Sequence, residues 1–304
     1  MKVGVLGLGN IAQKAYLPVY TQMQDQAEFY FATRNKEVQK KLQNEYHLQH
    51  MSTYLDDLLA EGIQACFIHT ATKTHYSLVK KCLENGVDVF VDKPLSEDIA
   101  EVEELLNLAK KKERILMVGF NRRFAPMIER LNKQKKRMLF LEKNQVFNSE
   151  ETAFEIFDVF LHLVDTAIYL LDDPVQTFYS DIRETKQYLE TALLKLETKQ
   201  STAILSMDTK SGSNQENYQV TSEKGTHRLT HLTKYITQKE NIEQVETFGD
   251  WENTLVKRGF YPMVQAFLTA LKTRSTTDLH QENVYDSHKI CAEILKQVEK
   301  NRMS

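Results

Sequence analysis

The sequence predicts an α/β domain with a doubly wound parallel sheet, followed by an α+β domain with a mostly antiparallel open sheet. Residues 1–120 alternate between apolar strand patterns and helix patterns, which is typical of a parallel sheet. After residue 124 this alternation ends, and one long helical pattern precedes a run of strand patterns. The chain has 304 residues, more than one hydrophobic core usually supports. We therefore expect two domains, residues 1–122 and 123–304, with the last helix able to pack back on the first domain.

The first domain is expected to contain strands that alternate with helices. The strands are expected at residues 2–6, 28–33, 49–51, 65–70, 87–91 and 115–120, and the helices at 11–24, 36–46, 55–60, 74–85 and 99–111. Most of these strands are apolar throughout, as in sheets that are covered on both faces. Gly86 follows the fourth helix at the position where a left-handed residue commonly ends a helix.

The second domain is expected to begin with a long helix at residues 151–171. Alternating patterns then predict strands at 175–182, 188–197, 201–208, 218–221 and 227–235, and helices return at 253–272 and 281–300. Turn sequences at 211–214 and 223–226 indicate hairpins between the strands on either side of them.

The composition is that of an ordinary globular protein, with 27% charged residues and a net charge of −3. No stretch approaches 18 uninterrupted apolar residues, so we expect no transmembrane helix. The slight net acidity argues against nucleic acid as a partner. Cys66, Cys82 and Cys291 are odd in number and scattered, which favours reduced thiols and a cytoplasmic location.

The turn after the first strand carries the pattern G-x-G-x-x-A, from Gly7 to Ala12. The chain has only ten glycines, and three of them fall within the first nine residues. Between a strand and a helix, the first glycine of this pattern permits a tight turn and the second lets the backbone approach a pyrophosphate. The helix N-terminus attracts the anion. We therefore predict a Rossmann-type dinucleotide site that includes Gly7, Gly9, Asn10 and Ile11; the alternative is a tight turn that binds no ligand.

The end of the second strand indicates which nicotinamide cofactor is preferred. A carboxylate at this position favours NAD, but this chain has Thr33 and Arg34 there and no carboxylate before Glu37. A hydroxyl and a guanidinium suit a 2′-phosphate through charge-assisted hydrogen bonds. We expect NADP(H) to be favoured, with NAD(H) as the alternative.

Two further sets of polar residues could carry chemistry. Lys93 follows Asp92 at the end of a buried strand, where it either reaches solvent or lies beside a nicotinamide and shares a proton with a substrate hydroxyl. Asp158, His162 and Asp165 share one helical face at i, i+4 and i+7, among apolar residues. By itself this pattern favours a structural Asp, a core His and an ion-paired Asp. No metal site is expected, because no further His or Cys pair has matching spacing.

Five segments together resemble the Gfo/Idh/MocA family (glucose–fructose oxidoreductase / inositol dehydrogenase), and within it the MviM-type oxidoreductases. The segments are GLGNIA at 7–12, TATKTH at 70–75, NGVDVFVDKP at 85–94, MVGFNRRFAP at 117–126 and DVFLHLVD at 158–165. Their order and the late strand-rich region also agree with the family, so the resemblance covers nearly the whole chain. The sequence KRGF at 257–260 adds to the likeness.

The resemblance implies roles for individual residues. In family members that are dehydrogenases, the residue matching His162 accepts a proton, the residue matching Lys93 polarises the substrate hydroxyl, and Asp158 belongs to the same catalytic group. The residues then expected to bind the cofactor are Gly7, Gly9, Asn10, Ile11, Thr33, Arg34, Thr70, His75 and Asp92, and those expected to contact substrate are Asn121, Arg122 and Asp165.

The implied function is an NAD(P)-dependent oxidoreductase that transfers a hydride between nicotinamide and a carbinol carbon of a sugar, inositol or related polyol. Two alternatives stay open: a non-catalytic NAD(P)-binding sensor of the same fold, and a variant that uses the hydride chemistry transiently to cleave glycosides. The resemblance also implies a homo-oligomer, dimer or tetramer, formed through the second sheet. The expected partner is a small carbohydrate or polyol, with neither nucleic acid nor membrane.

Overall fold

The computed structural model describes residues 1–303 and separates them into two compact units. Unit one consists of Met1–Phe120 and Phe260–Gln281, and unit two of Asn121–Gly259 and the chain from Glu282 onward. The sequence grouped residues 260–281 with the second domain, whereas their contacts place them in unit one. The final helix, α11 (Val284–Met303), belongs to unit two.

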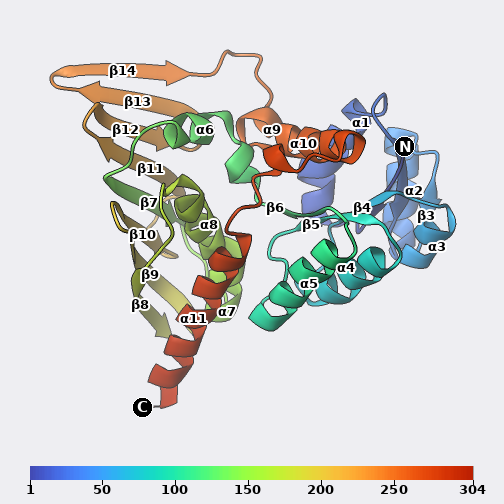
Figure 1. The fold of residues 1–304 in the computed structure, drawn as a ribbon, viewed down its shortest axis with the longest axis horizontal. Helices are drawn as coiled ribbons and strands as arrows, with labels where there is room; N and C mark the ends of the chain where they lie inside the picture. Colours follow the sequence, from blue (N-terminus) through green and yellow to red (C-terminus); the bar gives the residue numbers. More distant parts are fainter. Residues whose placement is uncertain (304) are drawn as a thin grey trace. The chain divides into compact units, whose positions relative to one another are not determined.

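Unit one is built on a parallel sheet with the strand order β3-β2-β1-β4-β5-β6. Its strands are β1 (Lys2–Leu6), β2 (Glu28–Ala32), β3 (Met51–Ser52), β4 (Ala65–Ile68), β5 (Asp88–Asp92) and β6 (Leu116–Gly119). The chain moves outward from β1 to β3 on one side and from β4 to β6 on the other, so right-handed crossovers place helices on opposite faces. Figure 1 shows α4 (His75–Glu84) and α5 (Ile99–Lys111) on one face, and α1 (Leu17–Gln22) with α10 (Phe260–Thr273) on the other. The predicted doubly wound fold is confirmed.

The helix after β1 is less regular than the single α-helix we expected. Helical backbone begins at Asn10, but Ala12–Tyr16 form a π-helix before α1 begins. The wider turn lies directly before Pro18, which has no N–H to donate to a carbonyl of the preceding turn. Helices α2 (Lys36–Tyr46) and α3 (Leu55–Ala60) begin and end at the predicted residues.

The returning segment of unit one is held by aromatic packing and by one edge contact. The Phe267 ring of α10 lies 5.1 Å from that of Phe67 on β4 and 5.7 Å from that of Phe90 on β5. After the short turn η5 (Thr277–Leu279), the Gln281 side chain accepts a hydrogen bond of 2.7 Å from the backbone N–H of Val118 on the edge strand β6. This segment therefore completes the core of unit one although it follows most of unit two in sequence.

Unit two contains a sheet with the strand order β14-β13-β12-β11-β7-β10-β9-β8. Its strands are β7 (Met138–Asn144), β8 (Thr177–Thr185), β9 (Tyr188–Glu197), β10 (Thr202–Asp208), β11 (Gln215–Ser222), β12 (Gly225–Thr230), β13 (Lys234–Lys239) and β14 (Ile242–Thr247). All neighbouring strands pair antiparallel except β7 and β10, which are parallel. The predicted α+β domain with a mostly antiparallel open sheet is confirmed.

Several predictions for unit two were wrong in detail. Strands β7 and β14 were missed, although β7 lies in the middle of the sheet. Because β7 separates β10 from β11, the turn at 211–214 joins two strands that do not pair and is no hairpin. The strand expected at 227–235 is two strands, β12 and β13, joined by a tight turn at His231 and Leu232. The hairpin at 223–226 is confirmed, with Ser222 facing Gly225.

One face of the second sheet is covered by helices. The cover consists of α7 (Thr152–Glu155), the π-helix η4 (Ile156–Phe160) and α8 (Leu161–Leu170), with α6 (Pro126–Asn132) and α11 beside them (Figure 1). The inward residues of β7, Leu139 and Leu141, are buried, whereas the alternate residues Met138 and Phe140 are exposed on the other face. The helix expected at 253–272 is broken at Gly259 into α9 (Thr254–Lys257) and α10.

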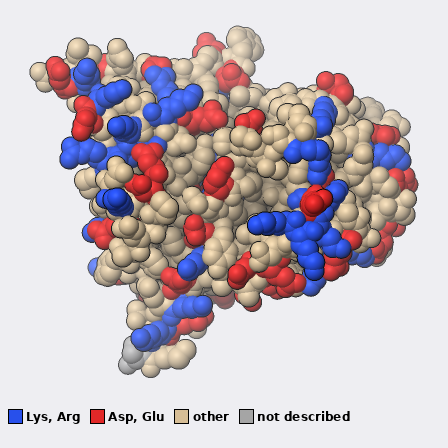
Figure 2. Space-filling view, in the orientation of Figure 1, with Lys and Arg blue, Asp and Glu red and all other residues tan. Residues whose placement is uncertain are grey.

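Acidic and basic side chains are interspersed on the face shown in Figure 2, and the net charge of the chain is −3. Within residues 1–303, no helix is both long and apolar enough to span a bilayer.

Candidate cofactor site and catalytic residues

The turn after β1 has the geometry that the glycine pattern predicts. Gly7 has a φ of +91°, and a Cβ at this residue would lie 2.8 Å from the carbonyl carbon of His69 and 2.9 Å from Cγ2 of Thr70. At Gly9 a Cβ would meet no protein atom within 4 Å. Gly7 is therefore required by the fold, while Gly9 faces open space in which a ligand can approach the backbone.

A cavity of about 540 Å³ opens beyond the carboxyl ends of β1, β2 and β4. The order of the sheet reverses between β1 and β4, and ligands of doubly wound folds bind outside such a switch point. The residues lining the cavity are Leu6, Gly7, Leu8, Gly9, Ala32, Thr33, Arg34, Asn35, Thr53, Tyr54, Leu55, His69, Thr70, Ala71, Lys73, Thr74, Ser77 and Leu78. They include two cationic side chains and no carboxylate, which suits a ligand with a pyrophosphate.

Five of the nine residues predicted to bind the cofactor line this cavity, namely Gly7, Gly9, Thr33, Arg34 and Thr70. The other four, Asn10, Ile11, His75 and Asp92, do not. Asn10 and Ile11 open the helix that follows the glycine turn, and the Ile11 side chain is exposed.

The ribose end of the cavity is shaped by the start of α2. The side chain of Asn35 caps this helix by accepting hydrogen bonds from the backbone of Glu37 and Val38. Gln39 is buried and donates to the carbonyl of Thr33 at 2.5 Å, which fixes the backbone beside Arg34. The Arg34 side chain is exposed at the rim, where its guanidinium is available to a phosphate.

Asp92 lies directly before Lys93, and its carboxylate bonds to groups of the protein. Its carboxylate accepts hydrogen bonds of 3.1 Å from the Tyr16 hydroxyl and from the backbone N–H of Lys93, and lies 3.7 Å from Nδ1 of His69. Burial by itself would raise the pKa of Asp92, but His69, Lys93 and Tyr16 lower it below its usual value. Asp92 is therefore ionised at neutral pH and orients the backbone at Lys93.

His75 connects two loops at the end of the sheet. Its Nε2 lies 2.9 Å from the carbonyl oxygen of Thr70 and its Nδ1 lies 2.8 Å from that of Pro94, which follows Lys93 through a cis peptide bond. The ring is buried, and this burial lowers its pKa. His75 thus joins the loop that lines the cavity to the Lys93 turn.

In unit two, Asp158 and His162 are half-buried, but Asp165 is not available to a ligand. Both oxygens of Asp165 accept from Arg123, at 2.9 and 2.6 Å, and one of them also accepts from Ser287 at 3.0 Å. The side chains of Arg123 and Asp165 are 0% and 1% exposed. The substrate contact that the resemblance implied for Asp165 does not fit this geometry, which matches the ion-paired Asp of the alternative interpretation.

Asn121 and Arg122, also expected to contact substrate, are both buried and bonded within unit two. The Asn121 amide donates to the carbonyl oxygen of Arg258 at 2.8 Å, and Arg122 pairs with Glu216 at 2.7 Å. Glu216 was not predicted as a site residue, because its partner Arg122 lies 94 positions away along the chain.

The π-helix η4 contains Asp158 and immediately precedes the helix that carries His162. A π turn has an extra residue and so changes which side chains share a face, and such turns are frequent at functional sites. Among residues 1–303, no group of three or more His, Cys, Asp or Glu side chains is arranged to hold a metal ion.

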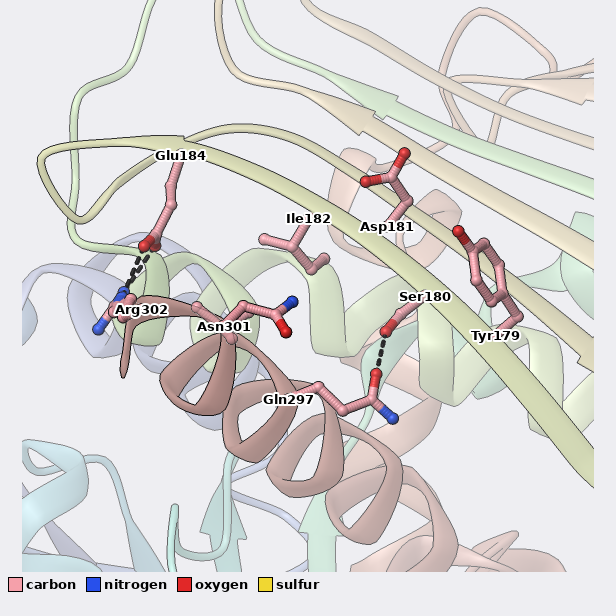
Figure 3. A pocket seen from close by; sticks show the side chains of 9 residues that line it. Tyr179, Ser180, Asp181, Ile182, Glu184, Gln297, Asn301 and Arg302 are labelled. Carbon is pink, nitrogen blue, oxygen red and sulfur yellow. Dashed lines mark hydrogen bonds and ion pairs between the residues drawn. The ribbon is translucent and has the colours of Figure 1, made fainter. Parts of the chain in front are cut away.

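A second concavity of about 400 Å³ lies in unit two between β8 and α11 and includes none of the predicted site residues. Its polar side chains bond to one another across the space, Ser180 to Gln297 at 2.7 Å and Glu184 to Arg302 at 2.6 Å (Figure 3). This pairing joins the final helix to the edge strand, and the concavity is not a candidate active site.

Comparison with known proteins agrees with these observations. Residues 1–120 match the GFO_IDH_MocA model, described as an oxidoreductase family with an NAD-binding Rossmann fold, and residues 126–240 match the YceM-like C-terminal domain. The oxidoreductase YceM of Salmonella typhimurium is 28% identical over 91% of this chain and 92% of its own length. The myo-inositol 2-dehydrogenase of Thermotoga maritima is 33% identical over 41% of this chain and 37% of its own length.

A solved structure agrees over the whole fold. The crystal structure of the dehydrogenase MviM from Clostridium difficile has a TM-score of 0.92, with 29% sequence identity over 98% of this chain and 99% of that one. The match therefore includes both units, the parallel sheet with its glycine turn and the open sheet. Residues 1–120 therefore belong to the Gfo/Idh/MocA family of oxidoreductases with an NAD-binding Rossmann fold, and the chain as a whole is similar to the YceM and MviM proteins.

Proposed function

We propose that the protein is an NAD(P)-dependent dehydrogenase or reductase that moves a hydride between nicotinamide and the carbinol carbon of a sugar, inositol or related polyol. The observation that carries this proposal is the cavity at the β1/β4 switch point, where the backbone at Gly9 is open to a ligand and Arg34 lies at the rim. The bound nicotinamide supplies or accepts the hydride.

The protein's own residues move the proton that accompanies the hydride. In the oxidative direction, His162 takes the hydroxyl proton as general base, and Asp158, one helical turn earlier, orients the imidazole. Lys93 stabilises the negative charge that develops on the substrate oxygen. Its backbone is held by Asp92 and by the contact between His75 and Pro94.

The substrate class rests on family membership and on relatives such as the myo-inositol 2-dehydrogenase. We also propose a homo-oligomer that forms through the uncovered face of the second sheet. The large apolar side chains of Met138 and Phe140 on β7 and of Leu193 on β9 are exposed there, although these strands lie inside the sheet and not at its edges.

The test is a screen of purified protein with NADP⁺ and NAD⁺ against sugars, inositols and polyols, followed at 340 nm. Steady formation of reduced cofactor supports the dehydrogenase. Tight cofactor binding without turnover of any substrate would instead indicate a sensor. Glycoside cleavage with no net change in the cofactor would indicate the hydrolytic variant.

Replacing Arg34 by Ala is expected to weaken NADPH binding by about 10- to 100-fold, the usual worth of a charge-assisted hydrogen-bonded pair. NADH has no 2′-phosphate, so its affinity should change much less. The affinities can be measured from the rise in reduced-nicotinamide fluorescence on binding. Lys40→Ala is the control, because Lys40 is an exposed cation on α2 outside the cavity. Equal loss of NADPH and NADH affinity in Arg34→Ala would contradict a role in 2′-phosphate recognition.

A further inference from the structure

Four charged residues, three of them cationic and one anionic, meet on the helix-covered side of the second sheet. The Glu216 carboxylate accepts hydrogen bonds from Arg122 Nε at 2.7 Å and from Lys143 Nζ at 2.9 Å. Arg258 Nη2 lies 3.9 Å from the same carboxylate. Tyr218 adds a neutral hydrogen bond of 2.6 Å. We call Arg122, Lys143, Glu216 and Arg258 the cationic cluster.

The cluster holds three cations and one anion. Burial alone would raise the pKa of Glu216, but Arg122 and Lys143 hold it well below its usual range, so Glu216 is fully ionised. The pKa of Lys143 is lowered by burial and by the neighbouring Arg122 and Arg258, which outweigh the attraction of Glu216. The cluster therefore carries an excess of positive charge, since the one carboxylate of Glu216 faces the three cations Arg122, Lys143 and Arg258.

The exposed side of the cluster is cationic. The side chains of Glu216 and Arg122 are 3% and 7% exposed, whereas those of Lys143 and Arg258 are 24% and 38% exposed. A molecule that approaches from solvent thus meets the two cations before it meets the carboxylate. Partly buried charge without a counter-ion is costly, and an incoming anion would relieve that cost.

The cluster lies at the level of the predicted catalytic residues within unit two. Strand β7 and the helix that covers it run antiparallel: Lys136 before β7 pairs with Asp172 after α8 at 2.7 Å, and Asn148 after β7 bonds to Glu155 in α7. Figure 1 shows β7 and α8 side by side.

Distances along these two elements locate Lys143. At about 3.3 Å per strand residue, Lys143 lies about 23 Å along from Lys136. At about 1.5 Å per helical residue, His162 and Asp158 lie about 15 and 21 Å back from Asp172. Lys143 has the same orientation as the buried Leu139 and Leu141, so its side chain is on the face that the helix covers.

We propose that Lys143 and Arg258 bind an anionic group of the substrate, so that the natural substrate is a sugar or polyol that carries a carboxylate or a phosphate. This rests on the proposed oxidoreductase function. The Glu216 carboxylate keeps the side chains of Lys143 and Arg258 in fixed positions. Arg122 balances the negative charge of Glu216. The carbinol carbon of such a substrate would lie near His162 while its anionic end pairs with the cationic cluster.

The test measures binding to the NADPH-saturated enzyme by calorimetry, which does not depend on turnover. The ligands are matched sets that differ in charge: glucose, glucuronate and glucose 6-phosphate, and myo-inositol with an inositol monophosphate. We expect at least one anion to bind tenfold or more tightly than its neutral partner. Lys143→Met and Arg258→Gln should each lower that ratio by about tenfold, toward equal binding of the anion and its neutral partner. Lys289→Met removes an exposed lysine of α11 that pairs with Glu293, and it should leave the ratio unchanged.

A second readout needs no sugar. Inorganic phosphate should slow the modification of Lys143 by trinitrobenzenesulfonate, followed by mass spectrometry, while the exposed Lys289 of α11 reacts at its usual rate. Equal affinity for the charged and neutral ligands within every matched set overturns the proposal. The proposal is also overturned if none of the anions binds and phosphate does not protect Lys143 from modification. Discrimination between anion and neutral partner without turnover would leave the anion site standing and remove the dehydrogenase function. Turnover of neutral polyols, with equal affinity for the charged and neutral ligands, would support the dehydrogenase function and remove the anion site. The affinities for glucuronate and for the sugar phosphates show whether the site prefers a carboxylate or a phosphate.

Discussion

Replacing His162 by Asn is expected to lower turnover by about 10²- to 10⁴-fold, the usual contribution of a general base. Asn keeps a polar side chain of similar size but cannot take a proton from the substrate hydroxyl. His162 is half-buried in unit two, far in sequence from the glycine turn that lines the cofactor cavity. The affinity for NADPH, measured by fluorescence, should therefore stay the same.

The matched control for this variant is His231→Asn. His231 is exposed in the turn between β12 and β13, with a φ of +52°, a backbone conformation that Asn tolerates well. Its replacement should change neither turnover nor NADPH affinity. Turnover that survives in His162→Asn would remove His162 from the mechanism, whereas a parallel loss of NADPH binding would indicate a folding defect.

Replacing Asp165 by Asn is expected to destabilise the protein by about 3–5 kcal/mol, because it leaves the buried Arg123 guanidinium without its counter-charge. Arg123 is fully buried, and both oxygens of Asp165 accept hydrogen bonds from it. A loss of this size is a large part of the about 5–15 kcal/mol that stabilises a typical protein. Urea denaturation followed by far-ultraviolet circular dichroism would measure it.

Two further variants separate a structural role for Asp165 from a role in substrate binding. Glu190→Gln breaks an exposed pair with Lys210 and should cost only about 0–1 kcal/mol. The double variant Arg123→Met/Asp165→Leu removes both buried charges and should recover much of the stability that Asp165→Asn loses. If Asp165→Asn raised the KM for substrate while the urea midpoint stayed unchanged, Asp165 would be a substrate contact after all.

The cofactor side of the molecule could be predicted from the sequence because its signals are local. The glycine turn, the strand before it and the helix after it all lie between Lys2 and Gln22, and each follows from backbone sterics and hydrophobic periodicity. The same holds for α2, α3 and α5, whose predicted bounds are those of the structure. The π-helix after the turn carried no such signal.

Strand β7 was missed because its pattern is short and ambiguous. Outward-facing Met138 and Phe140 interleave with inward-facing Leu139 and Leu141, so the segment shows no alternation between apolar and polar residues. Its partners, β10 and β11, lie more than sixty residues further along the chain. A strand whose pairing is entirely long-range has little to mark it within its own sequence.

By itself the sequence determined the fold class of both units, the glycine turn and the cationic end of the second strand, because these depend on residues close together in the chain. Only the tertiary structure decided what the isolated polar residues do. It assigned Asp165 to Arg123 and Arg122 to Glu216, over separations of 42 and 94 residues. A buried charge must find a counter-charge wherever the fold provides one, and that partner cannot be inferred from spacing along one helix.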